Sequence, residues 1–163
     1  MRLAPTVNLS GTLAPAPNGS AAPFHTLRLM RAAIARCRID PAIIQAAHTI
    51  IYLEPERDEL AEARALFDFV RDRVKYVRDV YGLETLTSPA KVLQRQTGDC
   101  DDQTALLCSL LESVGFPTRL VMGAFQGPEF DHVYCQVQIN GEWIDADPII
   151  RSHELGDAPG IPF

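Results

Sequence analysis

The stretch GDCDDQTALLCSLLESVG, residues 98–115, decides the fold of this chain. Its apolar residues recur at helical spacing, which predicts a helix with one side in a core. Gly98 is a helix breaker and Asp99 a candidate N-cap, so Cys100 is expected in the first turn. Backbone N–H groups and the helix dipole favour a thiolate there, whereas the three surrounding aspartates oppose one. The residues expected on the core side are Cys100, Thr104, Leu107, Leu111 and Val114.

A cysteine at this position has two interpretations. It can be an inert packing residue, because free cysteine is among the most buried residue types. It can instead be a nucleophile, if a histidine and an orienting acid lie within its reach. The other cysteines, Cys37, Cys108 and Cys135, fall at core-facing positions and are expected to be packing residues.

The composition limits the class of protein. A chain of 163 residues that is 47% hydrophobic and 22% charged is typical of one soluble globular domain. The net charge of −6 argues against nucleic acid as a partner, and no apolar run has the length of a membrane span. We expect neither a metal nor a cofactor, because no CxxC pair or EF-hand spacing is present. Without a secretory signal pattern, the expected localisation is cytoplasmic.

The order of sequence patterns predicts an α+β domain, with N-terminal helices followed by a small antiparallel sheet. The segment 1–23 is rich in Pro, Gly and Ser and is expected to be a flexible arm. A domain at 24–150 and a C-terminal tail at 151–163 follow. Helices are expected at 24–37, from Pro41 onward, at about 56–76, at 88–94 and at 100–115. In the third of these, Leu60 is expected to face inward. Strands are expected at 117–125, 132–139 and 142–147.

Asn140-Gly141, between two strand patterns, predicts a β-hairpin with a two-residue loop. Side chains alternate along a strand, so His132 and Asp147 share one face as diagonal neighbours within hydrogen-bonding reach. Asp145 lies two residues further along and is too distant. The expected pairs are Ile139–Glu142, Gln138–Trp143, Gln136–Asp145 and Tyr134–Asp147. The opposite face, with Val133, Cys135, Val137, Ile139, Ile144 and Ala146, is expected to be the buried one.

Cys100, His132 and Asp147 together supply a thiol nucleophile, an imidazole base and a carboxylate that fixes the tautomer. Taken singly, His132 is explained as a surface strand residue and Asp147 as a turn residue before a proline. The joint presence of the three types in these positions favours catalysis. The backbone N–H of Cys100 is the expected oxyanion donor, and Gln94, six residues upstream, is a candidate for the second one.

Four segments carry a resemblance to a known family: TGDCDD at 97–102, VGFPTRLV at 114–121, DHVY at 131–134 and GEWIDADP at 141–148. The chain resembles the transglutaminase-like superfamily of papain-like fold over about residues 60–150, and looks like its compact bacterial and bacteriophage versions. The resemblance implies Cys100 as nucleophile, His132 as base and Asp147 as orienting acid. It also implies acyl-enzyme chemistry on an amide of a protein or peptide, by hydrolysis or by transfer to an amine. A non-catalytic binding or assembly module on the same fold is the remaining alternative.

Overall fold

The computed structural model describes residues 22–78 and 86–160. Helices come first and a three-stranded antiparallel sheet comes last, so the α+β prediction is confirmed. Among the residues so described, no helix has the length and apolar composition needed to cross a membrane. The elements are α1 (Ala22–Cys37), α2 (Pro41–Ile51), α3 (Glu59–Arg73), β1 (Lys75–Tyr76), α4 (Pro89–Arg95), β2 (Thr97–Gly98), α5 (Cys100–Ser113), β3 (Thr118–Gly123), β4 (His132–Ile139) and β5 (Glu142–Ala146).

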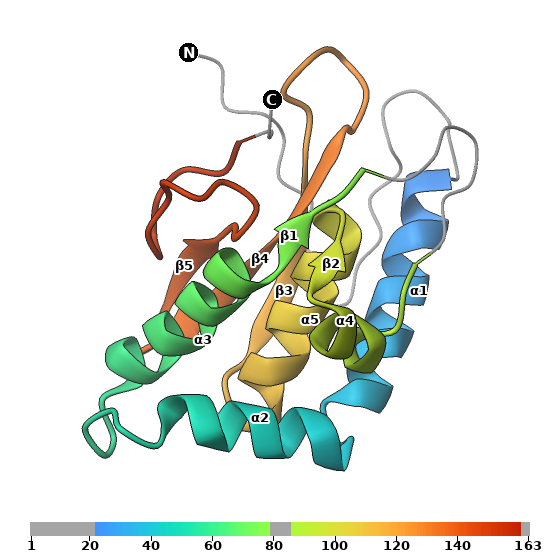
Figure 1. Cartoon of the computed structure of the whole chain (residues 1–163). Coiled ribbons are helices and arrows are strands. Elements are labelled where there is room, and N and C mark those ends of the chain that lie inside the picture. Colours follow the sequence, from blue (N-terminus) through green and yellow to red (C-terminus); the bar gives the residue numbers. More distant parts are fainter. Residues whose placement is uncertain (1–21, 79–85, 161–163) are drawn as a thin grey trace.

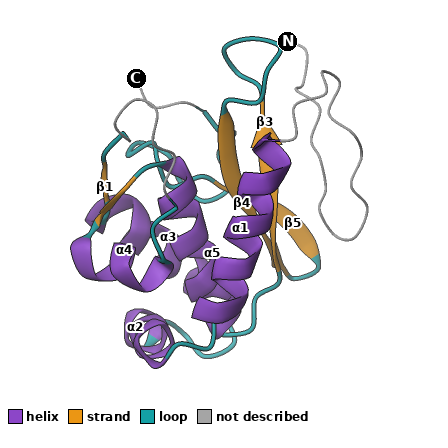
Figure 2. Ribbon diagram, turned by 90° about the vertical axis from the view of Figure 1, so that its right-hand side faces the viewer, coloured by secondary structure: helices purple, strands orange, loops and turns teal. Residues whose placement is uncertain are grey.

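Helix α5 is the centre of the domain (Figure 1). The sheet packs on one side of it and the other helices surround the rest (Figure 2). Every residue from Asp102 to Leu111 is buried. The prediction of a one-sided core helix is therefore too narrow, because a helix enclosed on all sides needs no polar face. Its buried Ser109 hydroxyl is satisfied within the helix, by donating to the carbonyl of Ala105 at 2.7 Å.

Helix α3 is shorter than its sequence pattern predicts. It begins after Asp58, whose carboxylate accepts a hydrogen bond from the N–H of Ala61 at 3.0 Å. It ends because Val74 is extended and the next two residues form β1, which pairs in parallel with β2. Leu60, expected to face inward, is 38% exposed in the first turn. Pairing between β1 and β2 therefore overrides the helical periodicity of the sequence.

The three-stranded sheet has the order β3-β4-β5. The hairpin register matches the prediction, from Ile139 opposite Glu142 to Gln136 opposite Asp145. Asn140 and Gly141 both have positive φ, +50° and +85°, as the type I′ turn requires. The expected Tyr134–Asp147 pair falls just beyond β5, which ends at Ala146.

The face of the sheet opposite the apolar one is also covered, near the start of β4, which the sequence did not indicate. His132 and Tyr134 are 5% and 4% exposed, although they lie opposite the apolar face. Residues 151–160 of the expected tail contact the domain: the N–H of Gly156 donates to the carbonyl of Asp145 at 2.8 Å. Arg71 of α3 donates to the carbonyl of His153, also at 2.8 Å. The expected arm 1–23 lies outside the described residues, except for the two that begin α1.

Candidate active site

Cys100 is the first residue of α5, as predicted. Asp99 is the N-cap, and its carboxylate accepts a hydrogen bond from the N–H of Asp102 at 3.1 Å. Gly98 allows β2 to pass this first turn closely, since a Cβ on it would lie 2.6 Å from the Cβ of Asp102. In this motif of glycine, aspartate and cysteine, Gly98 thus permits the close approach of β2 and Asp99 caps the helix. Together they place Cys100 at the helix N-terminus.

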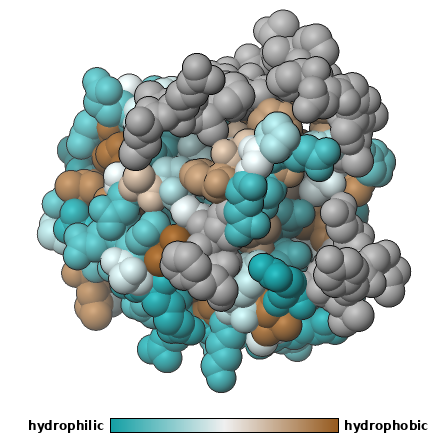
Figure 3. Space-filling view, turned by 90° about the horizontal axis from the view of Figure 1, so that it is seen from above, coloured by the Kyte–Doolittle hydropathy of each residue, from teal (hydrophilic) through white to brown (hydrophobic). Residues whose placement is uncertain are grey.

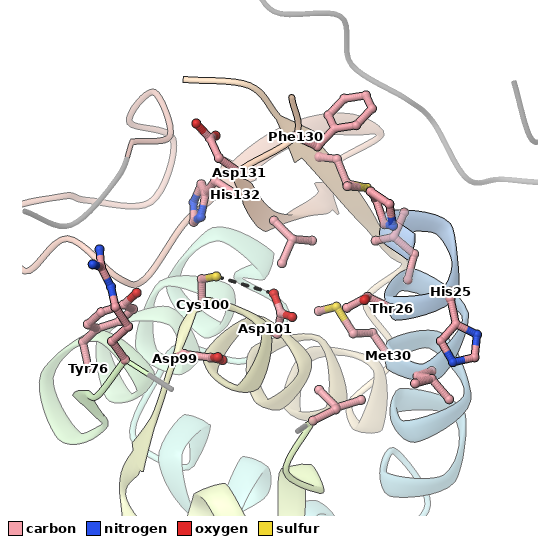
Figure 4. Close-up of a pocket in the computed structure, with 17 residues that line it drawn as sticks. His25, Thr26, Met30, Tyr76, Asp99, Cys100, Asp101, Phe130, Asp131 and His132 are labelled. Atoms are coloured by element: carbon pink, nitrogen blue, oxygen red, sulfur yellow. Dashed lines mark hydrogen bonds between the residues drawn. The ribbon is translucent and has the colours of Figure 1, made fainter. Parts of the chain in front are cut away.

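Two hydrogen bonds join the first turns of α5 to the start of β4. Thr104 Oγ1 donates to the carbonyl of Val133 at 3.2 Å. The N–H of Val133 in turn donates to the sulfur of Cys100. Because Val133 follows His132 directly, these bonds place the thiol and the imidazole in one pocket of about 540 Å³ (Figure 4). Helix α5 thus approaches His132 at the N-terminal end of β4.

His132 and Asp147 form the hydrogen bond that the hairpin register predicts. His132 Nε2 and Asp147 Oδ2 lie 2.7 Å apart, and the two side chains are 2% and 0% exposed. The same oxygen accepts the N–H of Gly160 at 3.1 Å. The last described residue of the chain therefore helps to fix the carboxylate, which lies outside the pocket that Cys100 and His132 line.

Two aromatic rings pack against the imidazole of His132. Tyr134 stacks on it with ring centroids 6.0 Å apart, and Phe125 meets it edge to face at 5.7 Å. Burial, together with the charges of Asp145 and Asp147, raises the pKa of Tyr134 to about 12. Tyr134 is consequently neutral near pH 7. The rings and the carboxylate restrict the orientation of the imidazole.

The surroundings of Cys100 favour the thiol over the thiolate. Burial raises its pKa, the negative charges of Asp101 and Asp99 raise it further, and its hydrogen bond to Asp101 Oδ1 at 3.4 Å acts in the same direction. The N–H of Val133 lowers the pKa, but by less. Burial, which the sequence did not indicate, is the largest cause of the raised pKa, and the carboxylates add to it.

Tyr76 is a pocket residue that the sequence did not single out. It lies in β1 and lines the pocket with Cys100 (Figure 4). The guanidinium of Arg78 donates to its hydroxyl, while burial and the neighbouring Cys100 and Asp99 raise its pKa. Its hydroxyl therefore keeps its proton and can donate it. A two-residue parallel strand has no sequence signature, so the helical pattern around Tyr76 concealed this position.

Gln94, by contrast, is exposed on α4 and does not line the pocket. It is not placed to act as the second oxyanion donor that the sequence suggested. It lies one residue before the end of α4, and β2 separates that helix from Cys100 along the chain.

The comparisons with known proteins identify the family of this chain. A sequence profile described as the transglutaminase-like superfamily matches residues 47–148, more than half of the chain. The chain belongs to the transglutaminase-like superfamily. The match runs from within α2 to just beyond β5, so it includes Cys100, His132 and Asp147 but leaves α1 outside. Among curated proteins, none matches this sequence.

Three solved structures share the fold of this superfamily member. A proposed cysteine protease from Cytophaga hutchinsonii matches with a TM-score of 0.54 at 23% identity, over 66% of this chain and 36% of its own. A proposed protease from Parabacteroides distasonis matches with a TM-score of 0.58 at 11% identity, over 74% of this chain and 26% of its own. A TGase matches with a TM-score of 0.51 at 15% identity, over 90% of this chain and 37% of its own. The chain thus spans between 26% and 37% of the length of these structures, and the likeness shows the fold alone.

Proposed function

We propose that this protein cleaves amide bonds in proteins or peptides, with Cys100 as nucleophile, His132 as general base and Asp147 as orienting acid. One observation carries the proposal: the imidazole that shares a pocket with Cys100 is hydrogen-bonded on its far side to a fully buried carboxylate. That arrangement fixes one ring nitrogen of His132 and leaves the other, Nδ1, for the thiol. The family match supports cysteine-based chemistry in general.

The raised pKa of Cys100 determines how the first step runs. The sulfur attacks the carbonyl carbon as its proton passes to His132, so no resting thiolate is needed. The C–N bond then breaks, and His132 returns the proton to the leaving amine. The resulting thioester is hydrolysed by water, whose proton passes to His132 before Cys100 is released with its own proton restored.

The negative charge on the carbonyl oxygen requires hydrogen-bond donors near the sulfur. The backbone N–H of Cys100 at the start of α5 is one, as the sequence suggests. The hydroxyl of Tyr76 is the second in this proposal. Its support is its place in the pocket, and the hydrogen bond from Arg78 that leaves the hydroxyl proton for another acceptor.

Alkylation with iodoacetamide tests the nucleophile. We expect Cys100 to react faster than Cys37, Cys108 and Cys135, which are buried, and we expect His132→Ala to abolish the difference. Hydrolysis of peptide amides by the wild type, lost in Cys100→Ser, completes the test. If all four thiols react equally slowly and no amide is cleaved, the proposed chemistry is wrong.

Transfer to an amine is distinguished from hydrolysis by a labelled primary amine. Ammonia release coupled to incorporation of the label into a glutamine-containing protein would assign acyl transfer, whereas release of a free acid would assign hydrolysis. A binding or assembly module would keep its biological role in Cys100→Ser.

A further inference from the structure

The pocket beside Cys100 has a wall that the superfamily match does not include. Helix α1 lies outside residues 47–148, yet its first two turns line the pocket opposite the thiol (Figure 4). Its contributors are Pro23, His25, Thr26, Leu27, Leu29 and Met30. The family profile therefore does not specify the residues of this wall.

The α1 wall is mainly apolar, whereas the side facing it combines apolar and polar side chains. Leu27 and Met30 are 3% and 0% exposed, so the domain holds them rigidly. Phe130 and Met122 line the same cavity from the sheet side. Around this end of the molecule, apolar and hydrophilic patches lie next to one another (Figure 3). An aliphatic side chain that packs against the apolar part of this lining loses contact with water, which lowers the free energy of the complex.

The charges around the cavity disfavour anions. Among the described residues that line it, three are aspartates, Asp99, Asp101 and Asp131, and one is an arginine. That arginine, Arg78, is engaged with the hydroxyl of Tyr76. An acidic side chain entering the cavity would meet like charge and lose its water, and both effects oppose binding.

From these observations we propose that the pocket binds an uncharged aliphatic side chain of a peptide or protein, next to the amide that Cys100 attacks, and that α1 sets this preference. The inference rests on the proposed function for the position of the scissile amide. Binding itself does not require catalysis, and the test uses this separation.

The test measures peptide binding to the full chain carrying Cys100→Ala, by isothermal titration calorimetry. The probes are acetylated pentapeptide amides that differ only at the central residue: leucine, methionine or glutamate. We expect the leucine and methionine peptides to bind at least about tenfold tighter than the glutamate peptide, because one buried aliphatic side chain supplies that much. Equal affinities would overturn the inference.

Leu29→Asp, added to Cys100→Ala, places a carboxylate on the wall at a position that is 47% exposed and tolerant of change. We expect it to reduce the affinity for the leucine peptide about tenfold. The matched control is Leu53→Asp, since Leu53 is 87% exposed and does not line the pocket, and it should leave the affinity unchanged. Thr26→Trp is a second wall variant that fills the cavity without adding charge, and it should weaken the same peptide. If neither wall variant alters binding, α1 does not set the preference.

The two proposals fail separately. Selective binding by Cys100→Ala, in a protein whose wild-type Cys100 neither alkylates nor cleaves, supports the pocket and rejects the chemistry. Cleavage of leucine and glutamate peptides at equal rates supports the chemistry and rejects the pocket.

Discussion

The two halves of the candidate site are built differently. His132 and Asp147 are almost fully enclosed, and strand pairing, two aromatic rings and a backbone N–H fix them. Cys100 is half-buried at a helix N-terminus, and burial, followed by the carboxylates of its own helix turn, raises the pKa of its thiol. The histidine half thus contributes a fixed geometry, whereas the cysteine half contributes a thiol whose reactivity depends on burial and on local charge. Each half is therefore sensitive to a different kind of substitution.

Asp147→Asn is expected to have the largest effect, since it acts on the enclosed half. The amide can hold the wrong tautomer of His132, so amide hydrolysis should fall about a thousandfold or more in kcat. Steady-state kinetics on a peptide amide checks this. The matched control is Asp145→Asn, two residues earlier, where the carboxylate binds Gln136 and not His132. A similar loss in both variants would remove the special role of Asp147.

Tyr76→Phe removes the proposed second oxyanion donor from the side of the cysteine. We expect kcat to fall about a hundredfold with KM little changed, because the lost bond forms only as charge develops on the carbonyl oxygen. Tyr52→Phe, at a tyrosine that is 81% exposed, is the control. An unchanged kcat in Tyr76→Phe would exclude the hydroxyl from the reaction.

Gly98→Ala tests the packing beneath the cysteine half. The added Cβ would meet the Cβ of Asp102 at 2.6 Å, so the free energy of unfolding should decrease by about 2 kcal/mol. Urea denaturation of the variant measures it. Gly127→Ala, where a Cβ meets no atom within 4 Å, should change stability little. Equal stability of the two variants would contradict the close approach of β2 to α5.

Asp101→Asn is expected to have the smallest effect, and the effect is an increase in the alkylation rate of Cys100. In the wild type, the raised pKa of Cys100 predicts an alkylation rate that keeps increasing with pH beyond the range of a free thiol. Removing the Asp101 charge and acceptor lowers that pKa, so the rate profile should move to lower pH, with about a tenfold increase near neutrality. Glu56→Gln removes the same charge at an exposed position and is the control. A profile that does not move would show that burial alone governs the thiol.

The sequence predicts the histidine half well because its determinants are local. The Asn140-Gly141 turn permits positive φ at both positions, and strand alternation then fixes which carboxylate reaches His132. The N-cap at Asp99 is equally local, and it locates the start of α5. The predictions that failed concern features that depend on distant contacts. The end of α3 depends on the pairing of β1 with β2. The burial of the His132–Asp147 pair depends on segments before and after the hairpin, Gly160 among them.

By itself, the sequence determined the order of elements, the hairpin register and the position of Cys100 at a helix N-terminus, because caps, turns and side-chain alternation act over a few residues. Only the tertiary structure decided that α5 is enclosed on all sides, that Tyr76 and α1 line one pocket with Cys100, and that burial and carboxylates raise the pKa of its thiol. Desolvation and charge depend on which segments surround an atom. Those neighbours come from positions far apart in the chain, and no local pattern specifies them.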